Sequence, residues 1–201
     1  MNTWISRGVV FALSAFGLAA CETAPTNSGA RSLPTQALLA NGAVLLVAPA
    51  GYCVDTRSKK DAFALLARCD TMGGETGAGV PLGVITATAL PATSDRALPD
   101  AAEFQATRGV RRVFEQFAGR SQTLVRAEGP APAPGLSTLH WRGTTRVGGH
   151  MLAVAVYGPE GSAATGREGR QLAQQVMARS RSGTDALLRS RQAAGQTPAA
   201  P

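Results

Sequence analysis

The sequence feature that most restricts the fold is a β-hairpin predicted from Ser137 to Gly158. Its two strands alternate apolar and polar side chains around Gly148-Gly149, and glycines supply the positive φ angles that a two-residue turn needs. The register of this hairpin places its side chains on two faces. The face that we expect to join the core carries Leu139, Trp141, Thr145, Val147, His150, Leu152, Val154 and Val156. The opposite face carries His140, Arg142, Thr144, Arg146, Met151, Ala153, Ala155 and Tyr157.

Other segments extend this hairpin into an α+β domain. Apolar or alternating runs predict strands at 43–48, 52–54, 82–90 and 122–127. Helical spacing and capping residues predict helices at 61–69, 99–119 and 167–182, then a break at 183–185 and a short helical turn at 186–192. We therefore expect a single α+β domain, a largely antiparallel sheet of about five strands with three helices packed on it. The expected order, β-α-β-α-β-β-β-α, resembles the PsbP/Mog1-like α/β sandwiches at the level of fold alone.

The first 21 residues predict export. Met1 to Arg7 give a short, positively charged start and Gly8 to Phe16 an apolar run, which is the arrangement of a secretory signal peptide. The residues that follow, Leu18-Ala19-Ala20-Cys21, resemble the lipobox of bacterial lipoproteins. That resemblance implies that Cys21 receives a diacylglycerol and becomes the first residue of the mature protein. The alternative is an ordinary cleaved signal peptide: a cut after Ala20 would put Leu18 where a small residue is needed, whereas a cut after Ala19 puts Gly17 there, which is tolerated. Because Cys21 directly follows Leu18-Ala19-Ala20, lipidation is favoured.

Removal of residues 1–20 leaves three parts. Residues 21–36 hold the lipidated N-terminus and a small, polar segment that we interpret as a flexible tether, residues 37–192 form the domain, and residues 193–201 form a disordered tail. The mature chain keeps 19 of the 20 Lys and Arg residues against 13 Asp and Glu residues, a net charge of +6. This charge favours anionic partners, and at the cell envelope those are lipid phosphates and cell-wall polymers rather than nucleic acid. Glu22 is not the Asp that retains lipoproteins in the inner membrane, so the resemblance implies the outer membrane.

The remaining cysteines predict a disulfide. Cys53 and Cys69 are two in number in an oxidising compartment, whereas a zinc site would need two more ligands and both histidines lie far along the chain. Cys69 is expected on the inward face of the helix at 61–69, so that the bridge would join a strand to a helix. We therefore predict a Cys53–Cys69 disulfide and no metal site.

Two functions remain open, and the sequence favours the first. His140, Arg142 and Arg146 form a candidate anion-binding surface on the hairpin, which indicates a periplasm-facing binding or assembly module whose ligand the sequence does not name. The chain has no His-Glu-x-x-His, Gly-x-Ser-x-Gly or Ser-x-x-Lys motif, so no catalytic residue and no cofactor are predicted. The alternative is a small hydrolase with His140 or His150 as its base, between the Gly-rich loop at 71–79 and the Pro-rich loop at 129–135. That Gly-rich loop lacks the Lys-Ser/Thr ending of a phosphate-binding loop.

Overall fold

The computed structural model describes residues 32–74, 79–92 and 97–195, and these form one α+β domain. The described residues of the first half form five strands and a 3₁₀ turn: β1 (Gln36–Leu39), β2 (Val44–Val47), β3 (Tyr52–Asp55), β4 (Phe63–Arg68), η1 (Asp70–Met72) and β5 (Val84–Pro91). The second half contains α1 (Ala101–Ala106), β6 (Arg112–Ala118), β7 (Gln122–Glu128), β8 (Leu139–Val147), β9 (His150–Tyr157), η2 (Ala163–Thr165) and α2 (Arg167–Gly195). The observed element order therefore differs from the one on which the PsbP/Mog1-like resemblance was based.

Seven strands form one antiparallel sheet in the order β3-β4-β5-β9-β8-β7-β6. The hairpin of β8 and β9 lies near its centre, and Val147 pairs with His150 across the predicted Gly-Gly turn. β1 and β2 form a separate antiparallel hairpin. The antiparallel class is confirmed, but about five strands was too few.

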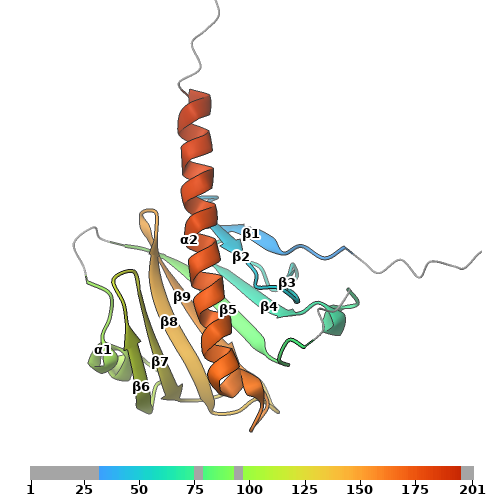
Figure 1. The fold of residues 1–201 in the computed structure, drawn as a ribbon, viewed down its shortest axis with the longest axis vertical. Coiled ribbons are helices and arrows are strands. Elements are labelled where there is room, and N and C mark those ends of the chain that lie inside the picture. The colour runs from blue at the N-terminus through green and yellow to red at the C-terminus, as the bar shows by residue number, and fades with distance from the viewer. Residues whose placement is uncertain (1–31, 75–78, 93–96, 196–201) are drawn as a thin grey trace, which may run out of the picture.

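The long helix α2 covers one face of the sheet and runs beyond the ends of the strands (Figure 1). Leu172, Ala173, Val176 and Met177 of α2 are buried. They pack with Leu152, Val154 and Val156 of β9 in the main hydrophobic core. At the start of α2, the Trp141 indole Nε1–H donates a hydrogen bond to the Gly166 carbonyl at 2.7 Å. The core therefore lies between α2 and the hairpin face that the sequence assigned to it.

The predicted break at 183–185 is wrong, because α2 continues through it. The side chains of Ser180 and Thr184 are fully buried against the edge of β2. The backbone N–H of Leu45 donates to Thr184 Oγ1 at 2.9 Å, and that of Val47 donates to Ser180 Oγ at 3.0 Å. These two hydroxyls satisfy strand donors that would otherwise be buried without a partner, and this contact outweighs the weak helix propensity of Gly183-Thr184-Asp185.

The predicted helix at 61–69 is strand β4. Ala64 and Leu66 are buried while Leu65 and Ala67 are half-buried, which is the alternation of a strand rather than a helical stripe. β4 pairs on both sides, with β3 and with β5. The i, i+3, i+4 spacing of Ala62, Leu65 and Leu66 also fits a strand, because short apolar runs do not distinguish the two periods well.

The predicted helix at 99–119 is two elements. Its start is confirmed, since Asp100 and Glu103 form a capping box, but α1 ends at Ala106 and Gly109 has a φ of 86°. The next residues form strand β6, where Phe114 and Phe117 are 48% and 37% exposed. The Gln105 side chain joins the two elements, because it donates to the Arg111 carbonyl at 2.6 Å and accepts from the Val113 N–H at 2.9 Å.

The domain begins before its predicted boundary. The Pro34 carbonyl accepts a hydrogen bond from the Val54 N–H at 2.7 Å, and the Thr35 carbonyl accepts one from the Ala48 N–H at 2.8 Å. Residues 34–36 therefore belong to the domain rather than to the tether. At the other end α2 reaches Gly195, so residues 193–195 of the predicted tail are helical. The signal peptide, Cys21 and residues 196–201 lie outside the described residues.

Candidate ligand-binding site

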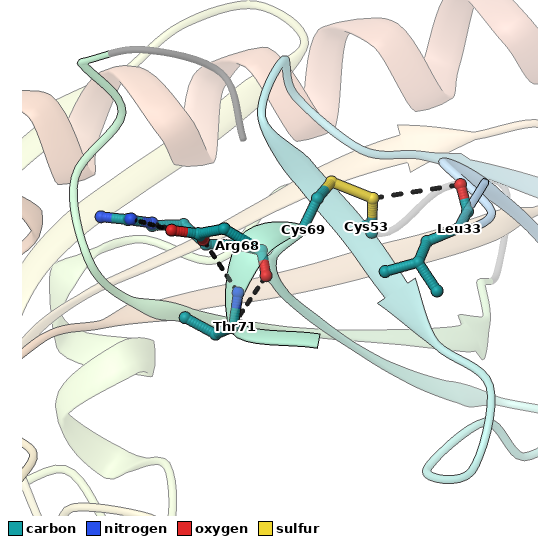
Figure 2. The surroundings of a disulfide bond; sticks show 6 residues. Leu33, Cys53, Arg68, Cys69 and Thr71 are labelled. Carbon is teal, nitrogen blue, oxygen red and sulfur yellow. Dashed lines mark hydrogen bonds and ion pairs between the residues drawn. A yellow bond between two sulfur atoms is a disulfide. The ribbon is translucent and has the colours of Figure 1, made fainter. Parts of the chain in front are cut away.

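Cys53 and Cys69 are joined by a disulfide with a Cα–Cα distance of 5.0 Å (Figure 2). It joins adjacent strands rather than a strand and a helix, because Cys69 directly follows β4 and its N–H donates to the Gly51 carbonyl beside β3. Both cysteines are buried, and the Leu33 carbonyl oxygen lies 4.0 Å from Cys53 Sγ. The bridge thus holds the edge of the sheet where the N-terminal segment enters the domain.

The sheet face opposite α2 is built from the other side chains of the same strands. Strand register places Thr86 of β5 and Arg142 of β8 on either side of Ala155 of β9. The next row along the strands consists of Thr88, Ala153 and Thr144, and the third of Leu90, Met151 and Arg146. We call this surface the open face, because α2 does not cover it. The hairpin register predicted its β8 and β9 members correctly.

A pocket with a volume of about 560 Å³ lies on the open face. Its floor consists of residues from β5, β8 and β9, and its far wall comes from α1 and the segment that precedes it. The lining includes Thr86, Thr88, Leu90, Arg142, Thr144, Met151, Ala153, Ala155 and Tyr157 from the strands, and Pro99, Glu103, Phe104 and Thr107 from the α1 region. This volume is typical of small-molecule sites.

His140 is fully buried, so its prediction as part of a surface is wrong. Its ring stacks on that of Tyr157 with centroids 4.6 Å apart. The pKa of His140 is lowered from 6.5 to about 4, chiefly by burial; the hydrogen bond with Thr138 opposes this shift and the nearby Arg142 charge adds to it. The imidazole is therefore neutral at neutral pH.

Both ring nitrogens of His140 are engaged. Nδ1 lies 2.9 Å from the Thr138 carbonyl oxygen, and Nε2 lies 2.8 Å from Nε of Arg142. Because a carbonyl and a guanidinium can act only as acceptor and donor respectively, the proton must be on Nδ1 and Nε2 must accept. His140 thus fixes the orientation of Arg142 instead of binding a ligand itself.

Arg142 is the predicted anion-binding residue that the structure places in the pocket. Among the residues that the structure describes, no carboxylate forms an ion pair with it, whereas Arg111 and Arg126 pair with Glu128 and Glu115. Its Nη2 lies 3.9 Å from the position that a Cβ on Gly109 would occupy. The guanidinium is therefore held at the end of the pocket next to the α1–β6 connection. Arg146 shares the open face but does not line the pocket.

Thr144 is a site residue that the sequence did not single out. Its side chain is 7% exposed, and its buried Oγ1 has no hydrogen-bond partner in the described part of the chain. The residues of α1 were also not predicted as site residues, because the sequence predicted one long helix at 99–119 where the structure has a helix of only six residues. The alternation of β8 contained the signal for Thr144, since it stands two residues from both arginines.

The proposed hydrolase base finds no support in the geometry. The Pro-rich loop joins β7 to β8 at the end of the sheet where β5 begins and the described part of the Gly-rich loop arrives. His150 lies at the opposite end, in the β8–β9 turn, and His140 has both nitrogens engaged. Within residues 32–74, 79–92 and 97–195, no group of three His, Cys, Asp or Glu side chains could hold a metal ion. No described helix is both long and apolar enough to cross a membrane.

Comparisons with known proteins add no family. No protein-family model, curated protein or solved structure shows significant similarity to this chain.

Proposed function

We propose that this protein is a lipid-anchored binding module at the periplasmic face of a bacterial membrane, with the outer membrane favoured. Its domain would hold an anionic envelope component in the pocket on the open face. The observation that supports this most is Arg142, a pocket residue held in place by His140 and paired with no carboxylate in the described ranges. An oriented cation in a concave, partly apolar site is typical of ligand recognition.

The anchor is supported by Leu18-Ala19-Ala20-Cys21, which follows a charged start and an apolar run. One cysteine that carries several acyl chains anchors a protein far more firmly than a single myristoyl group does. The net charge of +6 after export would also draw the domain toward anionic lipids.

Detergent phase separation tests the anchor. The wild-type protein should partition into the detergent phase, and Cys21→Ser should stay in the aqueous phase. The double variant Cys53→Ala/Cys69→Ala is the matched control, because it removes two cysteines without touching the lipobox and should partition as wild type does. If Cys21→Ser and wild type partition alike, the lipid anchor is refuted.

Crosslinking in the native envelope tests the binding role. A photoreactive amino acid at Leu90, which lines the pocket and is 49% exposed, should capture a partner or ligand. The same group at Gln175, on the exposed side of α2, is the control and should not capture that species. Equal capture from both positions, or none from either, would contradict a binding role for the open face.

A further inference from the structure

The pocket has a trough along β9. Ala153 and Ala155 are its short floor residues, and longer side chains stand on both neighbouring strands. Ala155 and Met151 are four positions apart, which is about 13 Å along a strand. The trough is therefore elongated, and its two ends differ in chemistry.

Arg142 stands beside Ala155 and gives this end its charge. Its Nε donates to His140, and among the described residues no acceptor forms a hydrogen bond with its two terminal nitrogens. Among the described lining residues Glu103 is the one acidic side chain, and its carboxylate accepts a hydrogen bond from the Asp100 N–H at the start of α1. The positive charge at this end is thus available to an anion.

A second, independent observation is the hydroxyl of Thr144. It is more than nine-tenths buried and lacks a partner, although buried hydroxyls are nearly always hydrogen-bonded. Thr144 follows Arg142 by two residues on the same face and lines the same pocket. Because Oγ1 is buried, a rotation of the Thr144 side chain about χ1 is needed to bring this hydroxyl to a polar ligand atom beside Arg142.

The far end of the pocket is lined by apolar side chains. Leu90 and Met151 pair there across β5 and β9, and Arg146 of the same row does not line the pocket. Phe104 of α1 lines the pocket nearer Arg142, because it packs on Val125, the β7 partner of Arg142. Leu90 stays 49% exposed, which leaves apolar area for a ligand to cover.

Resting on the proposed function, we propose that this pocket binds a single-chain anionic amphiphile. Its carboxylate or phosphate meets Arg142 and Thr144, and its alkyl chain lies over Ala153 toward Leu90 and Met151. A free fatty acid and a lysophospholipid share this chemistry, so the experiment includes a probe for each source.

Titration calorimetry on the Cys21→Ser chain recovered from the periplasm tests the ligand class. Dodecanoate, dodecyl phosphate and lysophosphatidylglycerol serve as probes below their micelle concentrations, with dodecanol as the uncharged control. Arg142→Gln should weaken dodecanoate binding roughly ten- to hundredfold, the range expected for loss of a charge-assisted hydrogen bond, and leave dodecanol binding nearly unchanged. Arg189→Gln, which removes one charge from the exposed end of α2, should leave dodecanoate binding unchanged.

A separate variant tests the proposed binding of the alkyl chain. Ala153→Leu fills the floor of the trough and should weaken every probe, so it also tests the site if Arg142→Gln does not fold. Binding of lysophosphatidylglycerol without dodecanoate would identify a lipid source, and the reverse a free acid. Equal affinity for dodecanoate and dodecanol, equal effects of Arg142→Gln and Arg189→Gln, or binding only to phosphatidylglycerol vesicles would overturn the proposal. If no amphiphile binds while crosslinking at Leu90 persists, the ligand class is wrong and the binding function stands.

Discussion

The two faces of the sheet use the same strands for different purposes. On the α2 face, β9 presents Leu152, Val154 and Val156, all at most 3% exposed and packed in the main core. On the open face the same strand presents Met151, Ala153 and Ala155, which are half-buried. Large aliphatic side chains fill the space between β9 and the helix. On the open face the alanines of β9 lie between threonines and an arginine of the neighbouring strands, and the space above these alanines is not filled. Side-chain size along one strand therefore separates the structural face from the candidate binding face.

The faces also differ in what holds them. The α2 face is held by close packing and by hydrogen bonds from Trp141 and β2 to the helix. The open face has the short α1 at one side, where Phe104 packs on Val125 and Ala127. At the other edge it has the Cys53–Cys69 disulfide, since register puts Cys53 on the same side as Ala67. The edge of the open face that lies away from α1 is thus held by a disulfide rather than by a helix.

The largest expected effect comes from removing that bond. Cys53→Ala/Cys69→Ala should lower the free energy of unfolding by about 3 kcal/mol, because the bridge closes a loop with a sequence separation of 16. Denaturant titration by far-UV circular dichroism measures the change. Reduction of the wild-type protein should give a similar loss, and the variant should not respond to reductant. An unchanged unfolding midpoint would mean that the open-face edge is held by other contacts.

The α2 face should be destabilised by a steric clash in its packing rather than by the loss of a covalent bond. A Cβ on Gly169 would lie 1.8 Å from the Ala164 carbonyl oxygen and 2.9 Å from Trp141 Cδ1, so the start of α2 must shift. We expect Gly169→Ala to lower the free energy of unfolding by about 2 kcal/mol, despite the better helix propensity of alanine. Gly195→Ala is the control, because nothing lies within 4 Å of its Cβ position. Thermal unfolding that is equal for both variants would contradict this tight contact.

The sequence predicted what depends on local alternation. The hairpin from β8 to β9, its turn and its two faces follow from a period of two and from Gly148-Gly149. The prediction of secondary structure from the sequence was wrong where pairing with distant strands outweighs the local preference. The spacing of apolar residues in β4 predicts a helix, but pairing with strands that lie far away in the sequence stabilises a strand there. The helix α2 continues through Gly183 because its Thr184 hydroxyl accepts a hydrogen bond from the backbone of β2.

The site was predicted to a similar extent. Arg142 and its face were identified from register, but register does not say how deep a residue lies. His140 and Arg142 are on one face, yet the first is fully buried beneath Tyr157 and the second lines a pocket. That depth depends on how α1 and the 129–135 loop close over the sheet, and no local pattern in the sequence contains this information.

The smallest expected effect is a pH dependence that distinguishes the buried end of the open face from the α2 face. Burial lowers the pKa of His140 from 6.5 to about 4, so between these values the unfolded chain binds a proton that the folded chain does not. The contribution of the neutral His140 to the free energy of unfolding is therefore fully present above about pH 6.5. As the pH decreases, the free energy of unfolding falls, by about 1 to 2 kcal/mol at pH 5. The described groups facing the ring are the Thr138 carbonyl, the Arg142 guanidinium, the Tyr157 ring and the backbone near Gly129, and none of these offers a carboxylate to an imidazolium.

His140→Gln separates this effect from the titration of surface carboxylates. Glutamine does not titrate, and its side-chain oxygen can still accept the hydrogen bond from Arg142 Nε. The variant should be less stable at every pH because it loses the stacking on Tyr157, but its free energy of unfolding should change less between pH 7 and pH 5 than that of the wild type. Denaturant titrations at the two pH values measure this difference of slopes. Parallel slopes would mean that His140 can take up a proton in the folded protein, and then its acceptor role toward Arg142 would not hold Arg142 in place at low pH.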